Sequence, residues 1–264
     1  MVATALTIAG SDSGGGAGIQ ADLKTFSALG VFGASVITAV TAQNTSAVTD
    51  VHPVPEASVA AQIAAVLDDI RVDAVKIGML GDAGLIGTVA SALRGYSGPV
   101  VLDPVMVSKS GARLLPDESR AALISQLLPR ATLLTPNLPE AAVLLDCAVA
   151  ASEDEMQDHG ARLREMSGGA VLMKGGHAQG ETCTDWLIAG EVTRLDAPRI
   201  ATRNTHGTGC SYSSAIAAGL ARGLTLRQAV ARAHGWLHAA IRAADRLEIG
   251  HGHGPVHHFH EVWT

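Results

Sequence analysis

One stretch of the sequence combines two glycines and a thiol at the expected start of a helix. The stretch reads Asn204-Thr205-His206-Gly207-Thr208-Gly209-Cys210-Ser211, and the small, apolar run Ala215-Ile216-Ala217-Ala218-Gly219-Leu220-Ala221 follows it. Because Gly207 and Gly209 lack side chains, an anion such as phosphate could reach the free N–H groups of the first helical turn. Cys210 would lie in that turn, where the helix dipole lowers the pKa of a thiol. A tight turn before a buried helix would explain the same pattern without any chemistry.

Unusual side chains also stand where the predicted strands end. They neither fit the apolar pattern of the strands nor simply form turns, and they are Asp12, Gln43, Met79, Asp103, Asn137 and Lys174. In an open parallel sheet the carboxyl ends of the strands share one edge, and ligands bind in the crevice there. We therefore expect these side chains to converge on one site.

Three charged residues in these positions could bind a phosphate or its metal ion. Asp103 precedes a proline and could hold Mg²⁺, directly or through water, although a solvated acid at a strand end is an equally simple interpretation. Glu140 lies three residues after Asn137 in the pattern of a helix capping box, which explains it without chemistry. Lys174 ends an apolar strand before two glycines. Such a lysine must either reach solvent or meet an anion.

The elements that must position these residues alternate between strand and helix. Period-two and apolar runs predict strands over 5–9, 35–40, 74–77, 100–102, 132–134 and 170–173. Helical spacing predicts helices over 19–29, 59–70, a segment ending near residue 93, 118–128, and two more beginning near Gly209 and Thr225. This alternation predicts an α/β fold of three layers, with a mostly parallel central sheet and helices on both faces. Segments 185–188 and 191–195 should add a small antiparallel edge.

The composition excludes several classes of function. A chain of 264 residues fits one α/β domain, which we expect to span 1–264. The formal charge of −6 gives no basic surface for nucleic acid or anionic lipid. Three widely spaced cysteines without C-x-x-C favour reduced thiols in a cytoplasmic protein. Residues 25–49 carry no charge, but polar residues punctuate them throughout, so we expect strand and loops and no membrane span.

Several familiar motifs fail on closer inspection. Asp12-Ser13-Gly14-Gly15 resembles the nucleophile segment of chymotrypsin-like proteases, but here it follows the first strand of an α/β chain. The dinucleotide pattern G-x-G-x-x-G fails because Ile19 stands where glycine or alanine is required, and the sequence contains no P-loop. Five histidines crowd the segment 251–260, which we interpret as a mobile tail and not as a metal site.

Taken together, the segments resemble a known family. They are similar to the bacterial hydroxymethylpyrimidine/phosphomethylpyrimidine kinases of thiamin biosynthesis, members of the ribokinase-like superfamily. The resemblance runs from residue 4 to the tail, and its motifs are Gly10-Ser11-Asp12-Ser13-Gly14-Gly15-Gly16-Ala17-Gly18-Ile19-Gln20-Ala21-Asp22, Thr41-Ala42-Gln43-Asn44, Lys76-Ile77-Gly78-Met79-Leu80, Leu102-Asp103-Pro104-Val105-Met106, Thr135-Pro136-Asn137-Leu138-Pro139-Glu140, Lys174-Gly175-Gly176-His177 and Asn204-Thr205-His206-Gly207-Thr208-Gly209-Cys210.

The resemblance implies a reaction and a role for each matching residue. ATP would phosphorylate the hydroxymethyl group of 4-amino-5-hydroxymethyl-2-methylpyrimidine, and then the monophosphate to the diphosphate. The implied site residues are Gln43 on the aminopyrimidine, Gly10, Asp22 and Met79 lining its pocket, Lys174 on the ATP phosphates, Asp103 and Glu140 on Mg²⁺, and Gly207, Thr208, Gly209 and Cys210 forming an anion hole. Cys210 stands where many ribokinase-like relatives have an aspartate as general base, and it either removes the substrate proton or only shapes the hole. His234 departs from the family, which often has lysine there.

Two alternatives stay open at this point. A pyridoxal kinase of the same superfamily would also phosphorylate a flat heteroaromatic alcohol. A pyrimidine-binding protein without catalytic activity would not need Cys210, Asp103 and Glu140 together. We expect a homodimer that binds the small pyrimidine and ATP.

Overall fold

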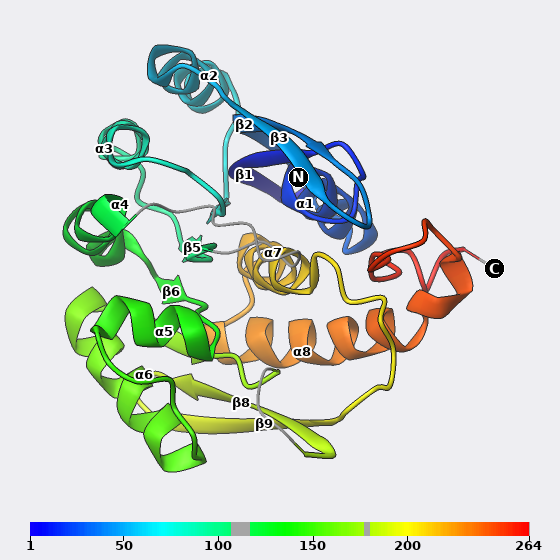
Figure 1. Ribbon diagram of the computed structural model, residues 1–264. Helices are drawn as coiled ribbons and strands as arrows, with labels where there is room; N and C mark the ends of the chain where they lie inside the picture. The colour runs from blue at the N-terminus through cyan, green and yellow to red at the C-terminus, as the bar shows by residue number, and fades with distance from the viewer. Residues whose placement is uncertain (107–116, 177–179, 264) are drawn as a thin grey trace.

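The computed structural model describes residues 1–106, 117–176 and 180–263. Within these residues the strands form one nine-stranded sheet in the order β3-β2-β1-β4-β5-β6-β7-β8-β9 (Figure 1). The strands are β1 Thr4–Asp12, β2 Phe32–Gln43, β3 Val48–Pro53, β4 Ala74–Ile77, β5 Val100–Leu102, β6 Leu133–Leu134, β7 Ala170–Met173, β8 Thr182–Ile188 and β9 Val192–Pro198. The six strands from β2 to β7 in this order pair in parallel, and β3 at one edge and β8 with β9 at the other pair antiparallel.

Helices cover both faces of the sheet. They are α1 Gly18–Ala28, α2 Glu56–Asp69, α3 Ala83–Ala92, α4 Asp117–Ala122, α5 Leu138–Leu145, α6 Glu153–Ser167, α7 Thr208–Ala221 and α8 Leu226–Arg242. The short turns η1 Leu123–Leu127 and η2 Leu128–Arg130 follow α4, and η3 Ala244–Leu247 follows α8. Helices α1, α7 and α8 lie on one face, and α2 to α6 lie on the other (Figure 1). The predicted three-layer α/β arrangement is therefore confirmed.

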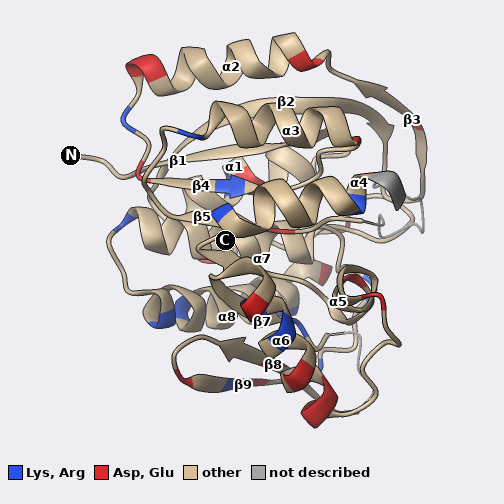
Figure 2. Ribbon diagram, turned by 90° about the vertical axis from the view of Figure 1, so that its left-hand side faces the viewer, with Lys and Arg blue, Asp and Glu red and all other residues tan. Residues whose placement is uncertain are grey.

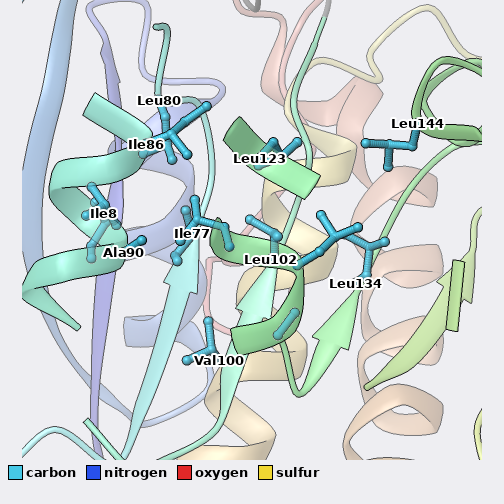
Figure 3. Packing of buried hydrophobic residues seen from close by; sticks show 14 of the residues in the cluster. Ile8, Ile77, Leu80, Ile86, Ala90, Val100, Leu102, Leu123, Leu134 and Leu144 are labelled. Carbon is cyan, nitrogen blue, oxygen red and sulfur yellow. The ribbon is translucent and has the colours of Figure 1, made fainter. Parts of the chain in front are cut away.

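The strands divide their side chains between two cores because successive residues of a strand point to opposite faces. In β4, Val75 and Ile77 pack toward α3, whereas Ala74 packs toward α7. Figure 3 shows the α3 side, where Ile77, Leu102 and Ile86 belong to one buried cluster. Burying each such aliphatic side chain contributes roughly 1.5–3 kcal/mol to stability. The parallel strands are mostly apolar on both faces because helices cover both.

Two helix starts form as their sequences predict. At α5, the Asn137 side chain accepts a hydrogen bond from the Glu140 N–H at 2.9 Å, and the Glu140 carboxylate accepts one from the Asn137 N–H at 2.8 Å. At α8, Thr225 and Gln228 form the second capping box. These reciprocal bonds satisfy amide groups that the first turn of a helix leaves without partners.

Two elements were not predicted, and both look polar in the sequence. Strand β3 is an edge strand whose residues are exposed or only partly buried and which ends at Pro53. Helix α6 buries a thin stripe that includes Met156 and Leu163. The segment 25–49 forms the end of α1 and then strand β2, and no helix in the described residues is long and apolar enough to cross a membrane.

Candidate active site

Three predicted site residues meet at the start of α7. Lys174, at the end of β7, forms a 2.9 Å ion pair with Asp103, at the end of β5. Thr135 donates a hydrogen bond to the same carboxylate at 3.0 Å, and Ser213 of α7 contacts its other oxygen at 3.3 Å. A Cβ atom on Gly209 would lie 3.4 Å from Lys174 Nζ and 3.6 Å from Asp103 Oδ2. Because Gly209 has no side chain, it leaves room beside the partly buried Lys174 cation and the buried Asp103 carboxylate. We call Gly209, Lys174, Asp103 and Glu140, whose charge also acts on Lys174, the phosphate end.

The charges at the phosphate end stabilise one another. Burial raises the pKa of Asp103, but the cations of Lys174 and Lys76 outweigh it and hold the pKa below its usual value. Burial lowers the pKa of Lys174, but Asp103 and Glu140 outweigh that effect, so its pKa is raised. Burial raises the pKa of Glu140 to about 7, with Lys174 opposing and Asp103 reinforcing the rise. Asp103 and Lys174 are therefore charged at neutral pH, and Glu140 titrates there.

The phosphate end suits a magnesium ion that a phosphate also holds. Asp103 and Glu140 supply carboxylate oxygens, and the described residues contain no cluster of three or more His, Cys, Asp or Glu side chains that would make a closed metal cage. Mg²⁺ in phosphate-transferring sites is bound by one or two carboxylates together with substrate phosphates and water. The donor set thus fits Mg²⁺ carried by a nucleotide better than a resident metal.

The start of α7 has the geometry of an anion hole. Gly207 is the N-cap residue with a φ of 74°, and a Cβ atom there would overlap the carbonyl oxygen of Gly16. Glycine is therefore required both by conformation and by space. Gly209 and Cys210 follow in the first turn, whose N–H groups have no acceptor four residues earlier within the helix. Thr208 donates its hydroxyl to the Thr205 carbonyl at 2.7 Å, which holds the loop against the helix.

The expectation of a lowered pKa at Cys210 is wrong. Burial raises the pKa of the thiol to about 11; Lys76 lowers it, while Asp22 and Asp103 raise it further. The helix start does place Cys210 in the first turn, as predicted. The pKa is raised because the partly buried thiol is desolvated and two carboxylates lie nearby. Cys210 is therefore a neutral thiol at pH 7.

Asp22 is buried in an ion pair and does not face an open pocket. Its carboxylate binds Lys76 Nζ at 2.8 and 2.9 Å, and both side chains are 0% exposed. Thr7 and Ser214 donate further hydrogen bonds to it at 2.6 and 2.7 Å. The resemblance implies a place for Asp22 at the pocket wall but assigns no role to Lys76. A lysine inside the central strand β4, which Figure 2 shows as a basic segment within the sheet, was the available signal, because such a charge must be paired.

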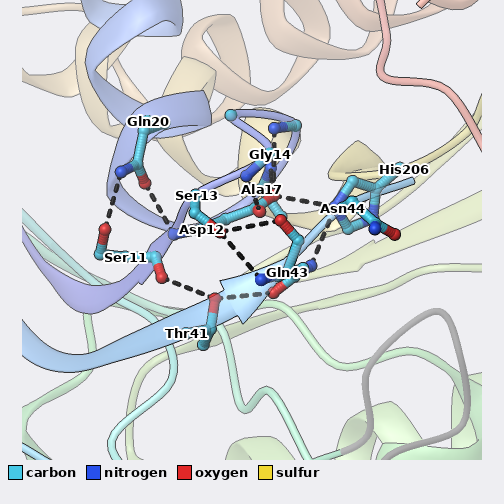
Figure 4. A network of polar contacts seen from close by, with 12 residues as sticks. Ser11, Asp12, Ser13, Gly14, Ala17, Gln20, Thr41, Gln43, Asn44 and His206 are labelled. Carbon is cyan, nitrogen blue, oxygen red and sulfur yellow. Dashed lines mark hydrogen bonds and ion pairs between the residues drawn. The ribbon is translucent and has the colours of Figure 1, made fainter. Parts of the chain in front are cut away.

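Gln43 lies in a second polar cluster, which we call the pyrimidine end. Its side-chain amide lies 3.1 Å from the Thr41 hydroxyl and 3.2 Å from His206 Nε2, while Ser13 Oγ bonds both its backbone N–H and its carbonyl at 2.8 Å. His206 Nε2 lies 2.9 Å from Asp12 Oδ2 (Figure 4). Asp12 was predicted at a strand end, whereas His206 was assigned no role. Its position directly before the anion hole could have suggested one.

Gly10 and Met79 lie against each other between β1 and β4. A Cβ atom on Gly10 would collide with the terminal methyl group of Met79. Met79 is partly exposed, and its backbone carbonyl accepts a 2.7 Å hydrogen bond from Thr38. The predicted convergence of strand-end residues is confirmed for two pairs. Asp103 and Lys174 are in direct contact, and Asp12 and Gln43 both contact His206.

The C-terminal segment is folded onto the site, so the interpretation as a mobile tail is wrong. The His253 N–H donates to the Thr45 carbonyl at 2.8 Å, and the His206 N–H donates to the Gly254 carbonyl at 3.0 Å. The Gly254 N–H in turn donates to the Asn204 side chain at 3.0 Å. The segment therefore connects the β2–β3 turn to the loop that forms the anion hole. His234 lies on α8 with its ring 6.3 Å from that of Tyr212.

Comparison with known proteins identifies the family. The phosphomethylpyrimidine kinase family model matches residues 12–257. A hydroxymethylpyrimidine/phosphomethylpyrimidine kinase of Rhizobium meliloti is 57% identical over 264 residues, covering 100% of this chain and 99% of the relative.

Solved structures agree on the fold. The pyridoxal kinase of Bacillus subtilis, in an ADP complex, superposes with a TM-score of 0.91 at 35% identity and covers 100% of both chains. The phosphomethylpyrimidine kinase of Clostridium difficile superposes with a TM-score of 0.81 at 42% identity, covering 91% of this chain and 100% of that one. The ribokinase-like fold is thereby confirmed, and the chain belongs to the hydroxymethylpyrimidine/phosphomethylpyrimidine kinase family.

Proposed function

We propose that this enzyme uses ATP to phosphorylate the hydroxymethyl group of 4-amino-5-hydroxymethyl-2-methylpyrimidine and then the resulting monophosphate, in thiamin biosynthesis. The ion pair of Lys174 and Asp103 beside Gly209 is the observation that carries this proposal. Phosphoryl transfer depends mainly on positioning and on neutralising charge, and a lysine beside the N-terminus of a helix supplies both.

At the phosphate end, Lys174 would bind the ATP phosphates, and the first-turn amides of α7 would receive the transferred group. Asp103 and Glu140 would hold Mg²⁺, which neutralises phosphate charge when bound. Support comes from the buried, mutually stabilised charges of these three side chains and from the ADP complex of the related pyridoxal kinase.

At the pyrimidine end, the Gln43 amide would bind the aminopyrimidine edge, because an amide offers a donor and an acceptor side by side. Gly10 and Met79 would form the wall against the flat ring, and Asp22 would act on the site through Lys76. The thiolate form of Cys210 would take the proton of the hydroxymethyl group, whose oxygen bonds to the γ-phosphorus of ATP as the bond to ADP breaks. Since burial raises the pKa of this thiol to about 11, the reaction should accelerate as the pH rises above neutrality.

A turnover assay tests the proposal. ATP consumption is measured with the pyrimidine alcohol, with its monophosphate and with pyridoxal, each with and without Mg²⁺. We expect Mg²⁺-dependent turnover of the first two substrates. Tight binding of the pyrimidine without ATP turnover would instead establish a silent binding protein.

Pyridoxal phosphorylation is a second candidate activity. The similarity to the Bacillus subtilis pyridoxal kinase, with a TM-score of 0.91, favours it. A pyridoxal kcat/KM at or above that of the pyrimidine alcohol would make it the main activity. A value several orders of magnitude lower would make it incidental.

We also propose that the chain acts as one kinase domain and assembles as a homodimer. Two exposed valines on neighbouring strands, Val40 at 47% and Val51 at 41%, offer apolar contacts at the β2–β3 edge, one on each face of the sheet. Sedimentation velocity of the enzyme measures its state, and a monomer across the micromolar range would contradict the dimer.

A further inference from the structure

Asp12 is held as a hydrogen-bond acceptor by the glycine loop that follows β1. Its Oδ1 accepts a bond from the Gly14 N–H at 2.8 Å, and its Oδ2 accepts bonds from the Gly16 and Ala17 N–H groups at 3.0 and 2.8 Å. Burial raises the pKa of this carboxyl, but the bonds from His206 and Ala17 outweigh it and the pKa is lowered. Asp12 is therefore a carboxylate that accepts hydrogen bonds and donates none.

The acceptor character of Asp12 fixes the proton on His206. Nε2 of His206 lies 2.9 Å from Asp12 Oδ2. If Nε2 carried no hydrogen, its lone pair and that of the carboxylate oxygen would repel each other at this distance. Nε2 must therefore carry hydrogen and donate it. The ring is held in place, because it is only 9% exposed and a Cβ atom on Gly16 would collide with it. Nε2 consequently has no lone pair to offer to Gln43.

The proton on His206 determines which way the Gln43 amide points. The amide nitrogen lies 3.2 Å from His206 Nε2 and the amide oxygen lies 3.1 Å from Thr41 Oγ1 (Figure 4), and a half-turn about the last side-chain bond of Gln43 exchanges the two atoms. Thr41 already donates its hydroxyl to the Ser11 carbonyl at 2.9 Å, so it can accept but not donate a second bond. With the amide turned so that its oxygen faces His206 and its nitrogen faces Thr41, the Gln43 N–H has Thr41 Oγ1 as acceptor, and the single N–H of His206 faces two acceptors, Asp12 and Gln43. The orientation in the structure instead sets two donors, His206 Nε2 and Gln43 Nε2, face to face.

We infer that His206, anchored by Asp12, is a positioning residue that selects one of the two orientations of the Gln43 amide. The inference rests on the proposed function, in which that amide recognises the pyrimidine. The selected orientation leaves one amide N–H and one lone pair of the oxygen free in a fixed order. A ring with an amino group next to a ring nitrogen matches that order. His206 thereby contributes to specificity for aminopyrimidines over heteroaromatic alcohols that lack this pair.

His206→Phe tests the inference because it keeps a ring and removes the donor. We expect the KM for the pyrimidine alcohol to rise roughly fivefold to tenfold, since one hydrogen bond is lost. The KM for ATP and the kcat should change by less than about twofold. His206→Gln, which can place an N–H near the same point, should restore most of the affinity. An equal loss in kcat, or no rescue by His206→Gln, would overturn the inference.

His258→Phe is the matched control. This histidine is 5% exposed and also bonds α7, through Ser211 at 2.9 Å, but it has no bond to Gln43. Loss of packing alone would shift both phenylalanine variants alike. If His206→Phe does not fold, Thr41→Val removes the other partner of the amide without changing shape, and it should also raise only the KM for the pyrimidine.

A double-variant cycle separates this inference from the proposed function. If His206 acts through Gln43, the variant Gln43→Ala/His206→Phe should have the same pyrimidine KM as Gln43→Ala alone. A KM equal to the product of the two single effects would refute the inference while leaving the role of Gln43 intact. An unchanged KM in Gln43→Ala would instead refute recognition by Gln43 itself.

Discussion

The phosphate end and the pyrimidine end hold their polar groups by different means. At the phosphate end, the cation of Lys174 is paired with the Asp103 carboxylate at 2.9 Å and stabilised by the nearby Glu140. At the pyrimidine end, one anchored carboxylate, Asp12, orients a neutral amide through His206. Transfer of a phosphoryl group needs charged groups close to the phosphate, whereas recognition of a ring needs hydrogen-bond donors and acceptors that point in the correct direction. Substitutions at the first should lower kcat, and substitutions at the second should raise KM.

Among the substitutions that test this difference between the two ends, Asp103→Asn should produce the largest change in kcat. The amide cannot balance Lys174 or hold Mg²⁺, so we expect kcat to fall on the order of a thousandfold. The KM for the pyrimidine should stay within about threefold. Both constants are measured by steady-state kinetics below the melting temperature of the variant. A large rise in the pyrimidine KM would show that the two ends are not separable.

Cys210→Ala should lower kcat on the order of a hundredfold if the thiol accepts the substrate proton. The pKa of about 11 adds a second signature: kcat of the parent enzyme should rise with pH from 7 to 9, and the variant should lose this slope. Near-normal turnover in Cys210→Ala would remove the role. A slope that survives the substitution would assign the base to another group.

Ser13→Ala gives a smaller effect confined to the pyrimidine end. The hydroxyl holds the backbone of Gln43 through two 2.8 Å bonds, so its removal should raise the pyrimidine KM about threefold to tenfold. Kinetics at saturating pyrimidine should show an unchanged kcat. A kcat that falls in proportion would mean that this loop also serves the transfer step.

Glu140→Gln should change the pH dependence of stability in the absence of ATP and Mg²⁺. Burial raises the pKa of Glu140 from 4.5 to about 7, so its folded form binds a proton more tightly than the unfolded form. Its stabilising contribution is present below pH 4.5 and is lost as the pH rises through about 7. The variant, compared with the parent, should therefore melt relatively higher at pH 8 than at pH 5. Equal differences at both pH values would contradict the raised pKa.

Apolar periodicity predicted the centre of the fold well. The strands at Ala74–Ile77, Val100–Leu102 and Ala170–Met173 have the predicted bounds, because they are buried on both faces and, apart from Lys76, consist of apolar residues. Strand β3 and helix α6 were not predicted because their sequences are mostly polar. For α6, Ser152 as N-cap before three acidic residues was an available signal.

Contacts within the candidate site were predicted better than its electrostatics. Strand ends singled out Asp103 and Lys174, which form an ion pair, and glycine spacing singled out the first turn of α7, whose role as an anion hole stays a prediction. The raised pKa of Cys210 and the burial of Asp22 depend on how α7 packs against β4, which residue types alone do not reveal. The role of His206 depends on a contact with Asp12, 194 positions away in the chain.

The hydrogen bonds of the C-terminal segment have a consequence for the order of events during synthesis. The pyrimidine end joins the loop after β1, the β2–β3 turn, the loop before α7 and residues 253–254. On the ribosome, the parallel strands can pair long before Gly254 has been added to the chain. The binding surface for the ring can close only afterwards, because its contacts are among the most distant in the sequence. A nascent chain would thus acquire its sheet first and its selectivity last.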